Sequence, residues 1–487
     1  MSSFGSIYSV RSGLDAARRA LDIVGQNIAN ASTQGYTRQE ASFIAAEPTN
    51  VIKSAGRGIS DTLVLRYRDE FLDRAFRNRT GMQGYYDTLS TQLSQVEEIV
   101  GDLSEGGLRT ALDQFFNAWD NLANRPTDSA ARAQVVTAAE DFIDTARAIF
   151  GDLTGVRTNV DESIGIKVKE INSAAEQIAT LNQEIMTQEV GRQPANELRD
   201  QRDRLLDSLA RLAGTTTVTH NDGSVTVYLG SLPLVDRNLA FPINATQAIE
   251  PDLDPGAGTF QQSTTTLTWN GTPTPALFTS GEVAGLMQVR DQIVPEYMKY
   301  LDNLVRTVAT AVNTEHTNGI PAADQVSVFT GSTAAALGST WLDIVVNPVI
   351  KADHSKIVAA ATVPALPALP APSDGGRALT IARLRDDTSL LSGKPLGTAT
   401  VTASEYLRAI SAHLGIDVQQ ASRQSEAAGL QVTQADRQRQ SVSGVSLDDE
   451  MTKMIQFQQT YNAAARMMTT LDEMLDVVVN RIGLVGR

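Results

Sequence analysis

The chain has 487 residues, of which 42% are hydrophobic and 20% are charged, and its formal net charge is −15 at pH 7. This composition is typical of a folded globular protein, and the length suggests about three domains at roughly 150 residues each. The negative charge argues against electrostatic binding to nucleic acid or to an anionic membrane surface. The sequence contains no cysteine, which excludes disulfides, thiol nucleophiles and cysteine-ligated metal sites.

The first thirty residues predict a long amphipathic helix. Its apolar residues alternate steps of three and four, the a/d pattern of a coiled coil, and charged residues such as Asp15 and Arg18 fall off that seam. An amphipathic helix on a globular core and a coiled-coil strand that seeks a partner both fit this pattern. The seam residues are Ile7, Val10, Leu14, Ala17, Leu21, Val24, Ile28 and Ala31.

The last forty residues repeat the pattern and provide a candidate partner. Ser446 is placed to cap this second helix, and the acidic residues Asp448 and Asp449 suit its first turn. Long apolar seams at both chain ends predict terminal helices that pair and serve in assembly. The C-terminal seam is Leu447, Glu450, Met454, Phe457, Tyr461, Ala464, Met468, Leu471, Leu475, Val478, Ile482 and Val485, in which only Glu450 is charged.

The predicted secondary structure of the middle of the chain alternates between helical and β-rich segments. Residues from about Asp61 to Leu212 read as helices packed in a bundle, and helix is predicted again over 281–318 and from about Ser404. Two β-rich runs flank Asn221-Asp222-Gly223-Ser224, which is a hairpin signal, and Pro321–Ser373 reads as a second irregular or β segment.

We therefore predict a mainly α fold with an inserted β-rich domain. The predicted units are a terminal coiled-coil assembly domain (1–45 with 441–487), a helical bundle domain (46–213 with 281–318 and 376–440) and an outward β-rich variable domain (214–280 with 319–375). The β-rich part reads equally well as one domain or two.

The sequence has no pattern that points to catalysis. Its four histidines are scattered, and it lacks a nucleophile elbow, a phosphate-binding loop and a zinc-binding helix motif. The acidic run Glu250–Asp254 lacks the spacing of a calcium loop. We predict a protein that is not an enzyme and holds no cofactor or metal.

Two short motifs carry a resemblance to a known family. After the first helix, Asn30, Thr33, Gly35, Tyr36 and Arg38 match in order the turn of flagellar rod, hook and hook-associated axial proteins. Near the other end, Gln456-Phe457-Gln458-Gln459 and Ala463-Ala464-Ala465-Arg466 are most similar to the family of flagellar hook-associated protein 1. The strong matching covers the two ends, about ninety residues.

The resemblance implies a structural subunit of the bacterial flagellum that joins hook to filament and is needed for filament assembly and motility. Its partners would be copies of itself, the hook protein, a second junction protein and an export chaperone at the C-terminal helix, without nucleic acid or membrane insertion. It would be extracellular, exported without a cleaved signal peptide. Alternatives are another axial protein (hook, rod or flagellin-like) or, from a different class, a secreted adhesin or hydrolase with coiled-coil ends.

Overall fold

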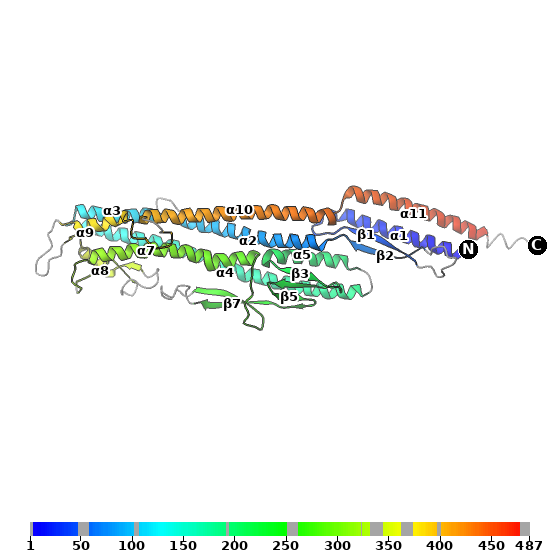
Figure 1. The fold of residues 1–487 in the computed structure, drawn as a ribbon, viewed down its shortest axis with the longest axis horizontal. Helices are drawn as coiled ribbons and strands as arrows, with labels where there is room; N and C mark the ends of the chain where they lie inside the picture. Colours follow the sequence, from blue (N-terminus) through cyan, green and yellow to red (C-terminus); the bar gives the residue numbers. More distant parts are fainter. Residues whose placement is uncertain are drawn as a thin grey trace, which may run out of the picture.

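The computed structural model describes residues 3–46, 58–101, 107–190, 194–250, 262–322, 324–331, 344–361, 374–396 and 401–477. The molecule is an elongated rod whose long helices run along its length, with most of the strands along one side (Figure 1). The two terminal helices lie side by side at one end of the rod.

The terminal pair consists of α1 (Ser3–Ala29) and α11 (Leu447–Asp476), which pack antiparallel (Figure 1). An antiparallel hairpin of β1 (Gln39–Ala45) and β2 (Ile59–Arg66) packs on α1. The predicted pairing of the terminal helices is confirmed. The predicted cap is also confirmed, because the Ser446 side chain accepts a hydrogen bond from the Asp449 amide.

The bundle is built from helices of very different length. The longest, α4, has 61 residues and spans about 90 Å at 1.5 Å per residue. α10 begins with a capping box in which Thr402 and Glu405 satisfy each other's backbone amides. The bundle helices are α2 (Glu70–Val100), α3 (Leu108–Asn124), α4 (Ser129–Glu189), α5 (Asn196–Ala213), α6 (Glu282–Gln288), the π-turn Val289–Ile293, α7 (Val294–Thr317), α9 (Gly376–Arg383) and α10 (Ala403–Ser443), with the shorter α8 (Pro348–Ala352) and the 3-10 turns His354–Lys356 and Leu384–Asp386.

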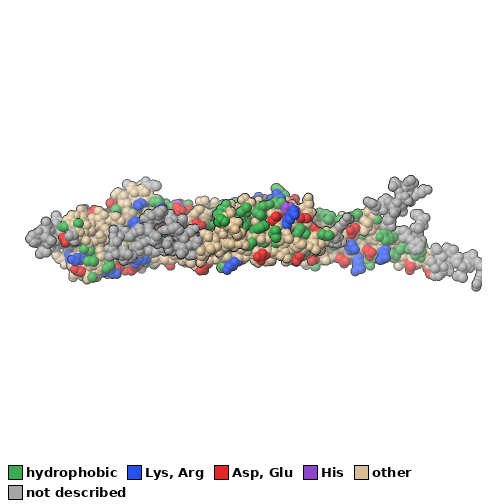
Figure 2. All heavy atoms as spheres, turned by 90° about the horizontal axis from the view of Figure 1, so that it is seen from below, with side chains coloured by type: hydrophobic (Ala, Val, Ile, Leu, Met, Phe, Trp, Pro, Cys, Tyr) green, Lys and Arg blue, Asp and Glu red, His purple; other side chains and the backbone are tan. Residues whose placement is uncertain are grey.

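The strands form small antiparallel sheets. β3 (Thr216–Thr219), β4 (Val225–Leu229), β5 (Leu232–Asp236) and β6 (Leu239–Ala240) pair in that order, and β7 (Ile243–Glu250) pairs with β8 (Gln262–Trp269). The predicted hairpin is the β3–β4 connection, where Gly223 has φ +81°. Figure 2 shows hydrophobic side chains gathered over this side of the rod, and the exposed ones include Val218, Leu232 and Leu239.

One contiguous apolar core joins the bundle to the strands. Its largest members are aromatic side chains, among them Trp119 of α3, Phe142 of α4, Tyr297 of α7 and Tyr406 of α10. Within the described residues, this core includes no side chain of α1 or α11. The terminal pair is therefore held by its own contacts, outside the main core. The mainly α fold with a strand-rich insertion is confirmed.

One detail differs from the sequence-based picture, and a second concerns the strands that the sequence left open as one domain or two. The helix predicted from about Asp61 begins instead at Glu70, because Ile59–Arg66 pairs as β2 with β1, a strand that the pattern did not reveal. The second β segment forms its own two-stranded sheet, β9 (Phe329–Gly331) with β10 (Ile344–Val346), and shares no described strand pairing with β3–β8. No helix in the described ranges is long and apolar enough to cross a membrane.

Candidate functional site: the terminal helix pair and its turn

From Glu450 onward, the seam predicted on α11 is the less exposed side of that helix, whereas its first predicted residue, Leu447, is half exposed. Met454, Phe457, Tyr461, Met468, Leu471 and Leu475 are all half-buried, whereas the residues on the opposite face are exposed. Phe457 also makes an edge-on ring contact with Phe43 of β1, with centroids 6.3 Å apart. This side of α11 therefore faces both α1 and the hairpin. Val478 and Ile482 lie outside the described residues.

The buried stripe of α1 is rotated slightly from the predicted seam. Val24 is fully buried, and Ile7, Val10, Leu14, Leu21 and Ile28 are half-buried. The rotation arises because α1 contacts α11 on one side and the β1–β2 hairpin on the other. The fully buried residues are Ala16, Ala17, Ala20, Ile23, Val24 and Asn27.

The outer face of α11 is unusually apolar for an exposed helix. Leu447, Met451 and Ile455 follow one another at four-residue spacing and are each at least half exposed. Met467 and Met474 are exposed further along the helix. Large apolar side chains in a row on a helix surface are characteristic of a face that another protein covers.

Asn27 is the polar centre of the terminal pair. Its Oδ1 accepts hydrogen bonds from the Tyr36 hydroxyl at 2.9 Å and the Gln39 amide at 3.0 Å. Its Nδ2 donates to the Gln39 carbonyl and to Glu450 Oε2, both at 2.8 Å. Glu450 is 1% exposed and also contacts Lys453. The single charged residue in the α11 seam is therefore the group that receives Asn27 of α1.

The motif residues build the turn that follows α1. Asn30 donates to the Gln26 carbonyl, the Thr33 hydroxyl donates to Asn30, and Gly35 adopts φ +78°. The Arg38 amide donates to the Ser443 carbonyl at the end of α10, and its guanidinium lies over the ring of Tyr67. The turn thus joins α1 to the α10–α11 connection.

Tyr36 is anchored in a partly buried, acidic environment. Burial, together with the negative charges of Asp200 and Glu450, raises the pKa of Tyr36 to about 12. The hydroxyl therefore stays protonated and donates to Asn27 across the physiological pH range.

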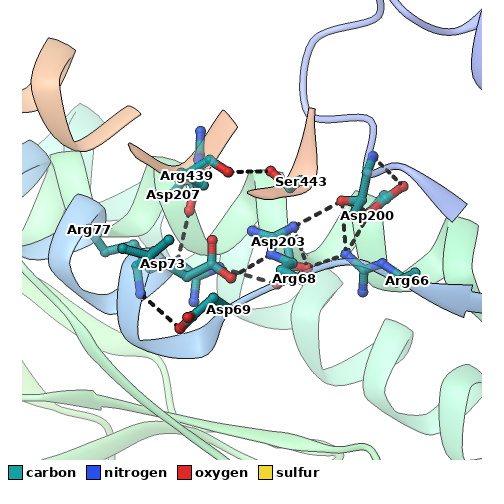
Figure 3. A network of polar contacts seen from close by, with 12 residues as sticks. Arg66, Arg68, Asp69, Asp73, Arg77, Asp200, Asp203, Asp207, Arg439 and Ser443 are labelled. Atoms are coloured by element: carbon teal, nitrogen blue, oxygen red, sulfur yellow. Dashed lines mark hydrogen bonds and ion pairs between the residues drawn. The ribbon is translucent and has the colours of Figure 1, made fainter. Parts of the chain in front are cut away.

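A network of ion pairs fastens this turn to the bundle (Figure 3). Asp200, Asp203 and Asp207 lie on one face of α5 at spacings of three and four residues. The Thr37 hydroxyl donates to Asp200 at 2.8 Å. The arginines come from four segments: β2 (Arg66), the β2–α2 connection (Arg68), α2 (Arg77) and α10 (Arg439). Arg66 contacts Asp200 at 2.6 Å and Asp203 at 2.9 Å, and Arg68 contacts Asp203 at 2.8 Å. Arg77 contacts Asp203 at 3.1 Å and Asp207 at 2.7 Å, and Arg439 contacts Asp207 at 2.7 Å.

Asp203 is the most heavily compensated charge of the network. Its burial alone would raise its pKa, but the positive charges of Arg68, Arg77 and Arg66 outweigh that effect and hold the pKa well below the ordinary value. Asp200 faces fewer arginines, so burial prevails and its pKa is raised despite the charge of Arg66. The network is thus a clamp that joins β2, α2, α5 and α10 at the base of the terminal pair.

Sequence reasoning missed both polar features. Glu450 was visible as an interruption of the apolar seam, and the acidic stripe on α5 was visible as spacings of three and four residues. Neither signal identifies its partners. Among the described residues, no group of three or more His, Cys, Asp and Glu side chains could hold a metal ion.

Three family models match the chain along its length. Residues 93–328 match the model of the flagellar hook-associated protein FlgK helical domain. Residues 7–37 match the flagella basal body rod protein model, and residues 437–482 match the model of the flagellar basal body rod FlgEFG protein C-terminal region. The last two matches cover most of α1 with its turn and all of α11.

Two of the curated relatives match over all or nearly all of the chain. Flagellar hook-associated protein 1 of Bacillus subtilis (strain 168) is 30% identical, with 100% of both chains covered. The protein of that name from Escherichia coli (strain K12) is 24% identical over 97% of this chain and 99% of its own length. That of Salmonella typhimurium is 28% identical over 64% of this chain and 56% of its own.

A solved structure shares the fold. The flagellar hook junction protein FlgK from Burkholderia pseudomallei superposes with a TM-score of 0.62 at 18% identity, covering 77% of this chain and all of that one. The full-length match to a relative at 30% identity, together with the family models at both ends and across the bundle, shows that the chain belongs to the flagellar hook-associated protein 1 family.

Proposed function

We propose that this chain is a structural subunit of the bacterial flagellum that joins hook to filament and is needed for filament assembly. One structural observation carries the proposal. The terminal helices pair outside the main core and expose a row of large apolar side chains on α11, as a subunit that packs against neighbours requires. The relatives named flagellar hook-associated protein 1 support the same role.

The proposed partners follow from this position in the flagellum. They are copies of the same chain, the hook protein on one side and a second junction protein on the other. Because α11 exposes Leu447, Met451 and Ile455, an export chaperone would cover this helix before assembly. Export would proceed from the cytoplasm without a cleaved signal peptide, to an extracellular location at the junction.

The proposed division of labour assigns assembly to the ends of the chain. The terminal domain (1–45 with 441–487) would make the contacts between subunits, the bundle domain (46–213 with 281–318 and 376–440) would provide the body, and the β-rich part (214–280 with 319–375) would lie outward. The separation of α1 and α11 from the main core supports the first of these assignments.

Electron microscopy of a deletion strain tests the proposal. Cells without this chain should carry hooks but no filaments, and a plasmid copy should restore filaments and swimming. Loss of hooks as well as filaments would instead indicate a rod or hook protein. Normal filaments in the deletion strain would contradict a junction role and favour a secreted protein of another class.

A further inference from the structure

A cavity of about 480 Å³ lies beside the ion-pair network, between β2, the start of α2, α5 and the strands β3 and β4. Its lining is rich in arginine, with six guanidinium groups against the four carboxylates of Glu70, Asp73, Glu189 and Asp203. The arginines are Arg66, Arg68, Arg74, Arg77, Arg199 and Arg202. The lining therefore carries two more positive than negative formal charges.

Most of these arginines already have a carboxylate partner. Arg68 and Arg77 contact Asp203 on the side drawn in Figure 3. Arg199 donates twice to Glu189, through Nε to Oε1 and through Nη2 to Oε2, both at 2.7 Å. Asp200 and Asp207, which do not line the cavity, pair with Arg66 and Arg77 from behind. The ion pairs therefore hold the walls of the cavity and leave Arg202 and Arg74 as its arginines without a carboxylate partner among the described residues.

Arg202 has no such carboxylate partner, and it is buried. Its residue is 3% exposed, and its Nη1 donates only to neutral oxygens, Oδ1 of Asn182 at 2.8 Å and the carbonyl of Gly223 at 2.7 Å. Among the described residues it forms no ion pair, and its buried Nε has no hydrogen-bond partner. A buried guanidinium with an open donor is costly unless an acceptor completes it.

Two neighbours extend the same feature. The buried Nε of Arg66 also lacks a partner within the described part of the chain. Arg74 lies exposed on α2 at the cavity wall and forms no ion pair with a described carboxylate. A buried guanidinium without a carboxylate partner and an exposed cation at the cavity wall together suit an oxyanion, because arginine donates in a planar fork.

We propose that this cavity binds a small oxyanion, phosphate or a small carboxylate, with Arg202 as its buried donor and Arg74 at its wall. Burial and the charges of Arg199, Arg66 and Arg77, only partly offset by Asp203, lower the pKa of Arg202 to about 10. A bound anion would stabilise the charged form of the Arg202 guanidinium. This anion site does not depend on the proposed junction role, and it is tested separately.

Calorimetric titration of the full-length chain tests the site, with phosphate and then citrate at an ionic strength held constant with sodium chloride. We expect saturable binding of one anion per chain, together with a rise in melting temperature relative to the chloride control. Arg202→Met should weaken the affinity about tenfold or more, because it removes a charge-assisted hydrogen bond. The absence of saturable binding by both anions would overturn the proposal.

Two further variants separate the site from general charge effects. Arg74→Ala, at an exposed position that folding does not need, should weaken binding about threefold. Arg79→Ala is the matched control, because Arg79 lies exposed on the same helix but contacts Gln431 and does not line the cavity. Equal losses in both alanine variants would show nonspecific screening and overturn the site. Circular dichroism shows whether Arg202→Met folds. If it does not fold, the test depends on Arg74→Ala, and an unchanged anion affinity in that variant would overturn the proposal.

Discussion

Gly35 is the residue of the family turn with the strictest conformational requirement. It has φ +78°, and a Cβ there would lie 2.7 Å from Cγ of Arg204. The exposed Arg204 side chain can move, but the left-handed backbone of an alanine costs about 1–2 kcal/mol. Gly35→Ala should therefore loosen the turn and speed hydrogen exchange of the Arg38 amide, which is bonded to the Ser443 carbonyl, by about five- to thirtyfold.

Gly25→Ala provides the matched control for this prediction. Gly25 lies in α1 with nothing within 4 Å of the position its Cβ would take. Alanine favours a helix over glycine by up to about 1 kcal/mol, so this variant should leave the Arg38 amide equally or better protected. Unchanged exchange in Gly35→Ala would show that the turn does not depend on the left-handed conformation.

His316 makes the stability of the bundle sensitive to acid. The ring is fully buried, Nε2 accepts from the Val358 amide at 3.0 Å, and Nδ1 bonds the Val326 carbonyl at 2.9 Å, so the neutral form is the one that fits. Burial, reinforced by the charge of Arg377, lowers the pKa of His316 from 6.5 to about 4. The unfolded chain thus takes up a proton near pH 6.5, whereas the folded chain does not until about pH 4.

Because the unfolded chain binds this proton at a higher pH than the folded chain, acid lowers the free energy of unfolding. The contribution of His316 to stability is complete above pH 6.5 and is lost as the pH falls toward 4, by about 3 kcal/mol. Denaturant unfolding at several pH values should show wild type losing about that much more stability than His316→Gln over this range. Parallel curves for the two proteins would show that the histidine is not held neutral.

The helix α11 has two apolar faces: an inner one that packs toward α1 and an outer one that is exposed. Leu471 and Leu475 lie half-buried on the inner side, toward α1. Replacing both by Asp removes apolar contacts and places two charges there, which should destabilise the terminal pair by about 2–4 kcal/mol. The thermal transition of the bundle should barely move, because neither residue belongs to the main core.

Filament formation reports the effect of this double variant. Cells that carry Leu471→Asp with Leu475→Asp should secrete monomer and lack filaments. Thr470→Ala with Glu473→Ala is the control, since both residues are exposed on the same helix, and these cells should swim normally. A large drop in the melting temperature of the bundle would place the two leucines in the globular core, and normal assembly would show that the seam is not used.

The whole molecule consists of a well-packed body and a lightly packed end. Side chains of α4 such as Val135, Ile164 and Ile171 are fully buried, whereas the seam of α11 is only half-buried. Local opening should therefore cost less free energy in the terminal pair than in the bundle. In a verified monomer, amides before Gly35 and after Ser443 should exchange much faster than those of α4. Equal protection of both regions would contradict this division.

Sequence patterns alone determined the elements whose signals are local. The three-four alternation in α1 and α11, the Ser446 cap and the Gly223 turn depend on residues only a few positions apart, so the chain's own periodicity predicts them. The terminal turn was likewise recognisable from five residues in order. Pairing of α1 with α11 followed because two matching apolar seams need a partner.

Only the tertiary structure decided which polar groups meet. Asn27 and Glu450 are 423 positions apart, and Arg66 reaches Asp200 across 134 positions. A charged residue in a seam, or an acidic stripe on a helix, indicates that a polar or oppositely charged partner exists. The sequence does not say which one, because every arginine of the chain could pair with an acidic residue equally well. The choice is made by the packing of α5 against α2 and of the turn against α10, because hydrogen bonds act over about 3 Å and carry no trace in local sequence.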